Sequence, residues 1–340
     1  MTVLAVLAEI EIDQSQHTSN LGQYDMRKYE IAGGFDPLWS RRSASQYGLP
    51  GGTRELPFID THDGTSNIWI HSKHANAGDY YTMYFGVYNS AGDKLLGIHG
   101  NKSNGVGKVG VDGCGKSGWL TNQPAIVVDD YDVCLNLQTK TLEGYRNGAL
   151  IASFDVSDTL PVDTVAVTCK FTGDSSTNTP NRKYAWSQLI VADEQTIGWH
   201  LKSASPSLAG AHQEFVGTAN DLNSIFLDET TLNSTDVPAI QTYIYEGVED
   251  PTNDPELTVG GVFLSSVCQS VGGAPAMFYN VVRIGGVDYH AGSTDVSGSD
   301  YANYGKPVTS AFPTNPATGL SWTEEDLLTA EFGFKCDDGI

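Results

Sequence analysis

The chain has 340 residues, 37 of them glycine, and a formal net charge of −22 at neutral pH. This charge argues against nucleic acid or an anionic lipid surface as the main partner, because phosphate binding needs clustered Lys and Arg. Abundant glycine with many Tyr and Phe, and no long helix-forming stretch, favours β-structure with many turns. No apolar run approaches 18 residues, so we expect no membrane-spanning segment.

Both the N-terminus and the cysteines indicate assembly in a reducing cytoplasm. The segment MTVLAVLAEIEID has no basic residue before its short apolar run, so we do not expect a secretory signal. The five cysteines are widely spaced and form no C-x-x-C pair, which predicts buried free thiols. They are Cys114, Cys134, Cys169, Cys268 and Cys336.

Strand patterns recur through the first part of the chain. Residues 80–88 form a long aromatic run, and apolar residues alternate with polar ones over 131–137. Asn147-Gly148 predicts a tight hairpin between two strands. Residues 164–171 and 183–193 read as two further strands. Seven or more short antiparallel strands predict a β-sandwich.

A nucleotide-binding pattern occurs over residues 110–117, GVDGCGKS, followed by the apolar segment AIVVDD. A phosphate-binding loop needs a buried strand before the glycines and a helix that begins at the Lys. The preceding residues are rich in Gly, Asn and Lys, and Gly118 and Pro124 leave no room for such a helix. We therefore interpret this segment as a glycine-rich loop.

The pattern changes around residues 199–210, within the segment WHLKSASPSLAGAH (199–212), where we place a domain boundary. The predicted domains are residues 1–202 and 203–340. Thr323 with Asp326 three residues later predicts the start of a short helix, and AEFGFK a last strand. Further strands are predicted within 224–228, 239–247, 258–270, 277–286 and 287–292. The fold class is therefore all-β, with two antiparallel sandwiches, the second of jelly-roll type.

The hairpin LNLQTKTLEGYRNGALIASFDV, residues 135–156, resembles the signature hairpin of concanavalin A-like (laminin G-like) lectin domains. The segments VAVTCKF and YAWSQLIVADE resemble the strand pair that closes the same sandwich. About 70 residues carry the likeness. It implies that the first domain is a concanavalin A-like sandwich.

A second resemblance lies in residues 187–201 and 218–231 and in the ending TNPATGLSWTEEDLLTAEFGFK. These segments resemble structural proteins of tailed bacteriophages and prophages. The likeness implies a virion protein of a tail, fibre or capsid surface, assembled in the host cytoplasm. It also implies contacts with other virion proteins and a homo-oligomer, with a trimer favoured. The residues that match the recurring ending are Asn315, Pro316, Trp322, Thr323, Asp326, Glu331, Phe332 and Gly333.

Sugar binding needs exposed aromatic side chains beside Asn, Asp or Gly, and Trp119 and Trp39 are the candidates. Each could instead be a packing residue. A host-surface glycan is the partner that such a site would take.

No cofactor is expected, and the eight histidines show no metal-binding spacing. Asp129, Asp130 and Asp132 could supply oxygen ligands to calcium, as could Asp295–Asp300, although neither run matches a full calcium loop. Acidic turns on an acidic protein are the alternative.

Catalysis would need paired carboxylates. Glu9, Glu11 and Asp13 share one face of a predicted strand at a spacing that suits retaining hydrolysis. No aromatic cluster accompanies them, so we favour a solvated edge strand. The sequence therefore predicts a non-enzymatic virion protein, most simply a tail-fibre, tail-tip or surface-decoration component that could also bind a host glycan. A capsid decoration protein is one alternative. A polysaccharide hydrolase (depolymerase) is the other.

Overall fold

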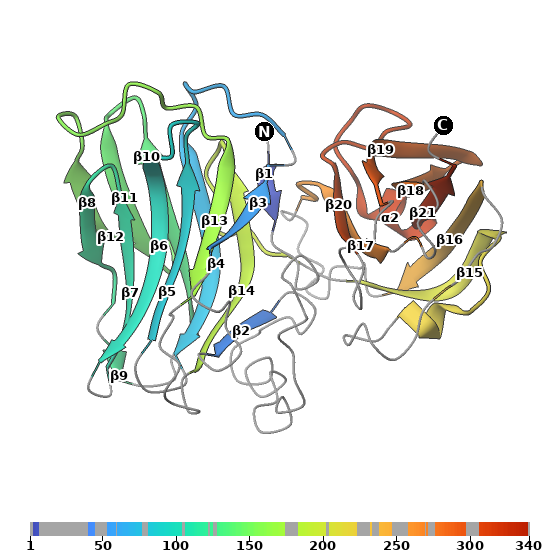
Figure 1. Cartoon of the computed structure of the whole chain (residues 1–340), viewed down its shortest axis with the longest axis horizontal. Helices are drawn as coiled ribbons and strands as arrows, with labels where there is room; N and C mark the ends of the chain where they lie inside the picture. The colour runs from blue at the N-terminus through green and yellow to red at the C-terminus, as the bar shows by residue number, and fades with distance from the viewer. Residues whose placement is uncertain are drawn as a thin grey trace. The chain divides into compact units, whose positions relative to one another are not determined.

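The chain forms two compact units, which meet in sequence at Leu201 and Lys202 (Figure 1). In this computed structural model almost all regular structure is β-strand, as the composition predicted. No helix among the described residues is long and apolar enough to cross a membrane. The described residues are 3–6, 40–44, 53–58, 60–76, 81–103, 106–121, 123–124, 128–173, 183–201, 204–222, 232, 238–246, 258–268, 270, 276–296 and 306–338.

Unit 1 is a sandwich of two seven-stranded antiparallel sheets, which we call sheet A and sheet B. Sheet A has the order β1-β14-β4-β10-β11-β12, and β2 pairs with β14. Its strands are β1 (Val3–Val6), β2 (Ser40–Ala44), β4 (Ile68–Asn76), β10 (Val128–Asn136), β11 (Thr141–Arg146), β12 (Ala149–Asp155) and β14 (Lys183–Ala192).

Sheet B has the order β3-β13-β5-β6-β7-β8, and β9 pairs with β7. Its strands are β3 (Thr53–Pro57), β5 (Tyr81–Tyr88), β6 (Lys94–Ser103), β7 (Val106–Gly113), β8 (Lys116–Trp119), β9 (Gln123–Pro124) and β13 (Thr168–Gly173).

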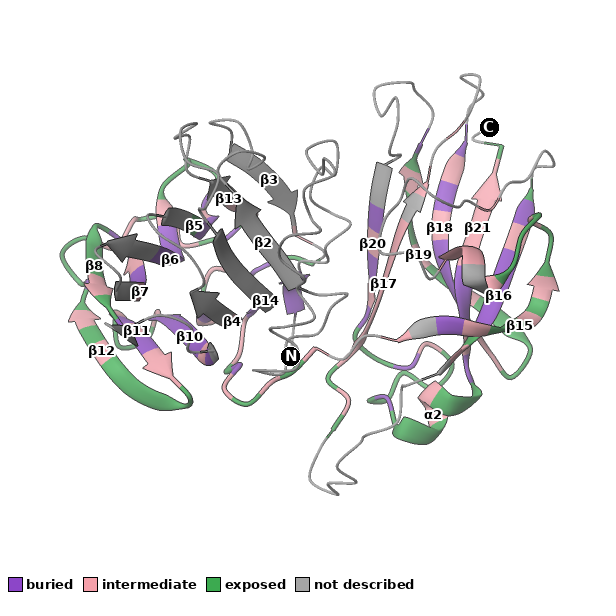
Figure 2. Ribbon diagram, turned by 90° about the horizontal axis from the view of Figure 1, so that it is seen from below, coloured by how far each residue is buried: buried purple, intermediate pink, exposed green. Residues whose placement is uncertain are grey.

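The core of unit 1 lies between the two sheets, because alternate residues of each strand turn inwards. Figure 2 shows this as buried colouring on β10 against exposed colouring on the edge strand β12. The remaining residues of each strand form the outer face of its sheet. Inward residues that are at most 1% exposed include Ile68, Ile70, Phe85, Val87, Leu96, Ile98, Val111, Val133, Leu135 and Leu142.

Two turns of unit 1 follow the sequence signals. Asn147 and Gly148 both have positive φ, 48° and 77°, and join β11 to β12 in the predicted hairpin. The segment with the nucleotide-binding pattern is also a hairpin, in which Cys114 and Gly115 form the turn between β7 and β8. A strand, not a helix, begins at Lys116, so the glycines serve a turn.

The strand predicted over residues 164–171 begins only at Thr168. Val165 and Val167 are 38% and 41% exposed, although the alternation placed them in the core. Hydrogen bonds to distant parts of the sequence hold this segment: the Ala166 amide donates to Nδ1 of His62 at 3.1 Å, and the Thr164 hydroxyl donates to the Gly64 carbonyl at 2.7 Å. Hydrogen bonds to distant residues therefore replace the strand pairing that the sequence pattern predicted for residues 164–167.

Unit 2 is a second antiparallel sandwich. Its larger sheet, sheet C, has the order β15-β16-β21-β18-β19, and β17 pairs with β20 in a separate two-stranded sheet. The elements are β15 (Ser205–Gln213), η4 (Ala219–Leu222), β16 (Ala239–Glu246), β17 (Val262–Cys268), β18 (Met277–Ile284), β19 (Val287–Asp295), β20 (Lys306–Phe312), α2 (Glu324–Thr329) and β21 (Glu331–Asp337).

Strand β15 corrects the sequence interpretation of residues 199–210 as a break in the strand pattern. Small residues and a proline hide the alternation there, yet β15 pairs with β16 in the same sheet. Two irregularities interrupt the pairing, between Pro206 and Leu208 and between Ala209 and Gln213. Such bulges remove the period of two that a sequence pattern detects.

A buried amide joins the two sheets of unit 2. Asn280 of β18 is 0% exposed. Its amide group donates to the carbonyls of Leu264 and Val308 and to the Ser310 hydroxyl, at 3.0 to 3.1 Å. Its oxygen accepts a hydrogen bond of 2.6 Å from the Ser266 hydroxyl. Both hydrogen-bonding ends of the side chain are therefore satisfied inside the sandwich.

The residues of the C-terminal motif support the fold. Thr323 and Asp326 form the predicted capping box at the start of α2. Trp322 is buried and its indole N–H donates to the Phe312 carbonyl at 2.7 Å. A side chain at Gly333 would overlap the Gln241 carbonyl of β16. The motif therefore fixes the last turn, helix and strand of unit 2.

Candidate functional site

The outer face of sheet B carries a row of three aromatic rings. The strand register places Tyr84 of β5 opposite His99 of β6, His99 opposite Gly110 of β7, and Gly110 opposite Trp119 of β8. The ring centroids of Tyr84 and His99 lie 5.9 Å apart, and those of His99 and Trp119 lie 4.8 Å apart. The row crosses four strands, about 14 Å at the usual strand spacing.

Glycines make this row possible. A Cβ at Gly110 would lie 2.5 Å from Nε2 of His99 and 2.7 Å from the Gly118 carbonyl. Without that atom, the imidazole lies across β7 and reaches the indole of Trp119. Gly97 of β6 acts similarly towards Asp112, its partner on β7: a Cβ at Gly97 would overlap a carboxylate oxygen of Asp112. Glycine in a strand often marks such close approach.

The two ends of the row are open to solvent. Trp119 is 45% exposed and Tyr84 is 39% exposed, whereas His99 between them is 8% exposed. Adjacent exposed apolar side chains that form a continuous patch, unlike single ones, often mark an interaction site. Trp and Tyr also present a flat apolar surface together with a polar group.

An ion pair adjoins the rings. Nζ of Lys94 donates to Asp112 at 2.7 Å, and Nδ1 of His99 lies 3.9 Å from the other carboxylate oxygen. Burial by itself would raise the pKa of Asp112, but the nearby His99 and Lys94 outweigh burial and lower it. Burial likewise opposes protonation of Lys94, and Asp112 outweighs it, so the pKa of Lys94 is raised. Both groups are charged at neutral pH.

Three lysine ammonium groups lie beside the aromatic rings. Nζ of Lys94 is 5.5 Å from the Tyr84 centroid, Nζ of Lys108 is 5.3 Å from that of Trp119, and Nζ of Lys170 is 5.2 Å from that of Tyr88. These are cation–π distances. We call this surface the aromatic face; it comprises Tyr84, Tyr88, Lys94, His99, Lys108, Asp112, Trp119 and Lys170.

The aromatic face can therefore stack a flat ligand and form hydrogen bonds and ion pairs with it. Of the two predicted sugar platforms, Trp119 belongs to this surface and Trp39 lies outside the described residues. The sequence analysis missed Tyr84 and His99. A signal was present, since Gly86, Gly97 and Gly110 each occupy an outward position between core residues.

The predicted calcium ligands do not converge. Asp129 is bound by Arg146 at 2.8 Å and by the Asn147 amide at 2.8 Å. Asp130 and Asp132 alternate with Asp129 along β10 and so point to the opposite face of sheet A. Asp132 accepts hydrogen bonds from the His71 and Thr196 side chains and is 1% exposed. The described residues contain no group of three His, Cys, Asp or Glu side chains arranged for a metal ion.

The other sequence candidates fall outside what the structure describes. Glu9, Glu11 and Asp13, the proposed hydrolytic carboxylates, are not among the described residues, nor are residues 297–300 of the second acidic run. All five cysteines are free thiols, as predicted. Cys114, Cys134 and Cys169 are buried, whereas Cys268 and Cys336 are only partly so.

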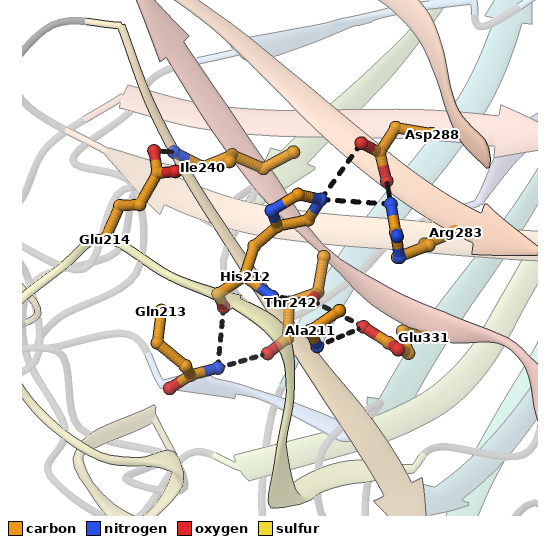
Figure 3. A network of polar contacts seen from close by, with 9 residues as sticks. All are labelled: Ala211, His212, Gln213, Glu214, Ile240, Thr242, Arg283, Asp288 and Glu331. Carbon is orange, nitrogen blue, oxygen red and sulfur yellow. Dashed lines mark hydrogen bonds and ion pairs between the residues drawn. The ribbon is translucent and has the colours of Figure 1, made fainter. Parts of the chain in front are cut away.

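Unit 2 contains a separate polar network on sheet C, drawn in Figure 3. The Glu331 carboxylate accepts hydrogen bonds from the Ala211 amide at 2.7 Å and from the Thr242 hydroxyl at 2.6 Å. Nearby, His212 and Arg283 both contact Asp288, at 3.0 and 2.6 Å. Ala211 and His212 of β15 are thereby bonded to Glu331 of β21 and to Asp288 of β19, so this network holds the irregular part of β15 in place.

No protein-family model matches the chain, and no curated protein sequence matches it. Solved structures similar to this chain include an alginate lyase from Pseudomonas aeruginosa, with 11% identity and a TM-score of 0.35, covering 45% of this chain and 81% of that one. A heptameric SAP-like pentraxin from Limulus polyphemus has 14% identity and a TM-score of 0.33, covering 46% and 76%. The CBM2 module of the evolved Dit of Lactobacillus casei BL23 phage J-1 has 12% identity and a TM-score of 0.31, covering 41% and 67%.

The comparison corrects one expectation. The sequence analysis predicted a protein without enzymatic activity, but several of the similar solved structures are alginate lyases. At this level of similarity the likeness concerns the sandwich alone. A sandwich of this type is therefore no reason to expect that the chain lacks catalytic activity.

Proposed function

We propose that unit 1 binds carbohydrate through the aromatic face. The observation that carries this proposal is the row of Tyr84, His99 and Trp119, whose rings lie in register across four strands. A row of this length suits several sugar units of a chain better than one sugar. The rings supply stacking surface, and Lys94 and Asp112 beside them supply donors and acceptors for hydroxyl groups.

We further infer that the protein is a virion component of a tailed phage, in a tail fibre, a tail tip or a surface decoration. The resemblance of the C-terminal ending supports this role. Unit 1 would then bind a host-surface glycan, while unit 2 contacts other virion proteins. Fibre and decoration proteins are commonly symmetric, so a homo-oligomer, with a trimer favoured, fits the role. Assembly in the host cytoplasm agrees with five free thiols.

Glycan binding is tested by screening the full chain on an array of bacterial surface polysaccharides and then titrating the best ligand. The Trp119→Ala variant should bind at least about tenfold more weakly, because Trp side chains are among the residues that most often dominate binding affinity. Leu150→Ala is the matched control, since Leu150 is 54% exposed on β12 of the other sheet. Equal loss in both variants, or in neither, would contradict the proposal.

The virion role needs a separate experiment. Cryo-electron microscopy of purified particles should reveal density for this chain on a tail, a fibre or the capsid surface. Density at a projecting fibre or tail tip supports host recognition, whereas capsid density supports decoration. Absence of the chain from infectious particles would contradict a virion role and leave the glycan-binding proposal to its own test.

A second candidate function is cleavage of the bound polysaccharide by the same face. His99 and Tyr84 are both side chains that transfer protons in enzymes, and they lie side by side in the ring row. Lys94 adds a positive charge that could stabilise a developing anion. A depolymerase acting on a host polysaccharide would place its substrate on this surface.

Cleavage is tested by the chain length of the best-binding polysaccharide after incubation with the protein, measured by size-exclusion chromatography. If the protein is a depolymerase, it should shorten the polymer, and His99→Gln should abolish this shortening even at polymer concentrations that saturate the variant. An unchanged chain length under conditions where binding is saturated would contradict cleavage and leave binding intact.

A further inference from the structure

The charge of the aromatic face differs from that of the chain as a whole. Beside the ring row, Lys94 and Lys108 stand against Asp112, which gives 2 − 1 = +1, whereas the whole chain has a net charge of −22. Lysine and arginine together number only 19 against 41 acidic residues. Cationic groups are therefore concentrated beside the rings that the proposed ligand would contact.

The single carboxylate of this surface is already neutralised. Asp112 accepts a hydrogen bond of 2.7 Å from Lys94, and its pKa is lowered by Lys94 and His99 against the effect of burial. It is thus ionised and paired, and contributes little repulsion towards an anion. Lys108 has no carboxylate within 4.0 Å among the described residues; its described neighbour is the indole of Trp119, 5.3 Å away.

The position of Lys108 suits a charged substituent of a stacked sugar. A sugar ring lying against Trp119 would place its substituents within a few ångström of Nζ, well inside the Debye length of about 8–10 Å. An ammonium group binds carboxylate, sulfate or phosphate as a point charge and does not require bidentate geometry. A neutral sugar could accept a hydrogen bond from Nζ but would gain no attraction between opposite charges.

We propose that the ligand of the aromatic face is an anionic polysaccharide, with Lys108 as the residue that selects charge and Trp119 as the stacking platform. This inference rests on the proposed glycan binding. The acidic remainder of the chain repels anionic polymers in general, so binding is favoured on this surface, where lysines lie beside the rings.

The test compares polymers that share a backbone and differ in charge, using the full chain and isothermal titration calorimetry. Polygalacturonate is compared with its methyl ester, and dextran sulfate with dextran. The wild type should prefer the charged member of at least one pair by about tenfold, and this preference should fall as salt is raised. The pair that shows the preference separates carboxylate from sulfate recognition.

Lys108→Gln should remove most of this preference, roughly a fivefold loss for the charged polymer, with little change for its neutral partner. Lys116→Gln is the matched control. Lys116 is an exposed lysine of the adjacent strand β8, three residues before Trp119, so the two side chains lie on opposite faces of sheet B. It should leave the preference unchanged.

The failures of the two proposals are distinguishable. Equal binding of charged and neutral polymers, with loss on Trp119→Ala, would overturn anionic selection and leave glycan binding standing. A preference for charge that Lys116→Gln reduces as much as Lys108→Gln does would also overturn selection by Lys108. Binding unaffected by Trp119→Ala would overturn the proposed site itself.

Discussion

Replacing Asn280 by alanine should destabilise unit 2. The side chain is 0% exposed and joins sheet C to the β17–β20 pair through four hydrogen bonds. Alanine leaves the Ser266 and Ser310 hydroxyls without this partner, and leaves the carbonyls of Leu264 and Val308 facing a small cavity.

The magnitude follows from these lost partners. A buried polar group left unsatisfied costs about 1–3 kcal/mol, and the freed hydroxyls can rotate to recover part of it. We therefore expect a loss of about 2–4 kcal/mol in the free energy of unfolding of unit 2. At the usual entropy of unfolding for a unit of this size, the transition temperature falls by roughly 8–15 °C.

Differential scanning calorimetry and urea unfolding of the full chain would measure this change. Ser207→Ala is the control, because its exposed hydroxyl makes a single hydrogen bond to the Ile244 carbonyl. It should cost less than about 1 kcal/mol. A loss below about 1 kcal/mol for Asn280→Ala would refute the reasoning that this amide couples the two sheets.

Three further predictions concern unit 1. Gly110→Ala should displace the His99 ring, which lies 2.5 Å from the added carbon. The variant should bind glycan more weakly and should lose about 1–3 kcal/mol in the free energy of unfolding of unit 1. Unchanged binding in titration would contradict the role of the ring row. Asp112→Asn should destabilise the unit at neutral pH and hardly at all in strong acid. The folded-state pKa of Asp112 is lowered, so its contribution to the free energy of unfolding is present above the usual pKa of 3.8 and is lost as pH falls through the folded-state pKa. A stability difference between variant and wild type that persists in acid would be evidence against the pair with Lys94. Cys114 should resist alkylation at pH 7, since burial raises its pKa to about 11 and leaves about one thiolate in ten thousand; rapid labelling of the native protein in mass spectrometry would disagree.

The local features of the fold were predictable where one short segment contains the whole signal. Asn147-Gly148 indicates its own hairpin, because both residues tolerate positive φ. Thr323 and Asp326 indicate the start of α2, because the capping box lies within four residues. Residues 164–167 were wrongly predicted as strand, because contacts with residues about 100 positions earlier decide their conformation.

The candidate site was predictable only in part, for a related reason. Trp119 stands out as an aromatic residue in a glycine-rich segment, but its neighbours His99 and Tyr84 come from other strands. Which residues share a row depends on the register between β5, β6, β7 and β8, and the sequence contains no local signal for that register. From the sequence, the outward glycines of these strands were interpreted as turn residues. Only the assembled sheet shows that they make room for side chains of the neighbouring strands.

The most direct test of carbohydrate binding is a crystal structure of the full chain with an oligosaccharide of the polymer that binds best. We predict sugar rings lying along the outer face of sheet B, with one stacked against Trp119 and another near Tyr84. An oligosaccharide bound elsewhere, with the three rings of the aromatic face unoccupied, would contradict the proposed site.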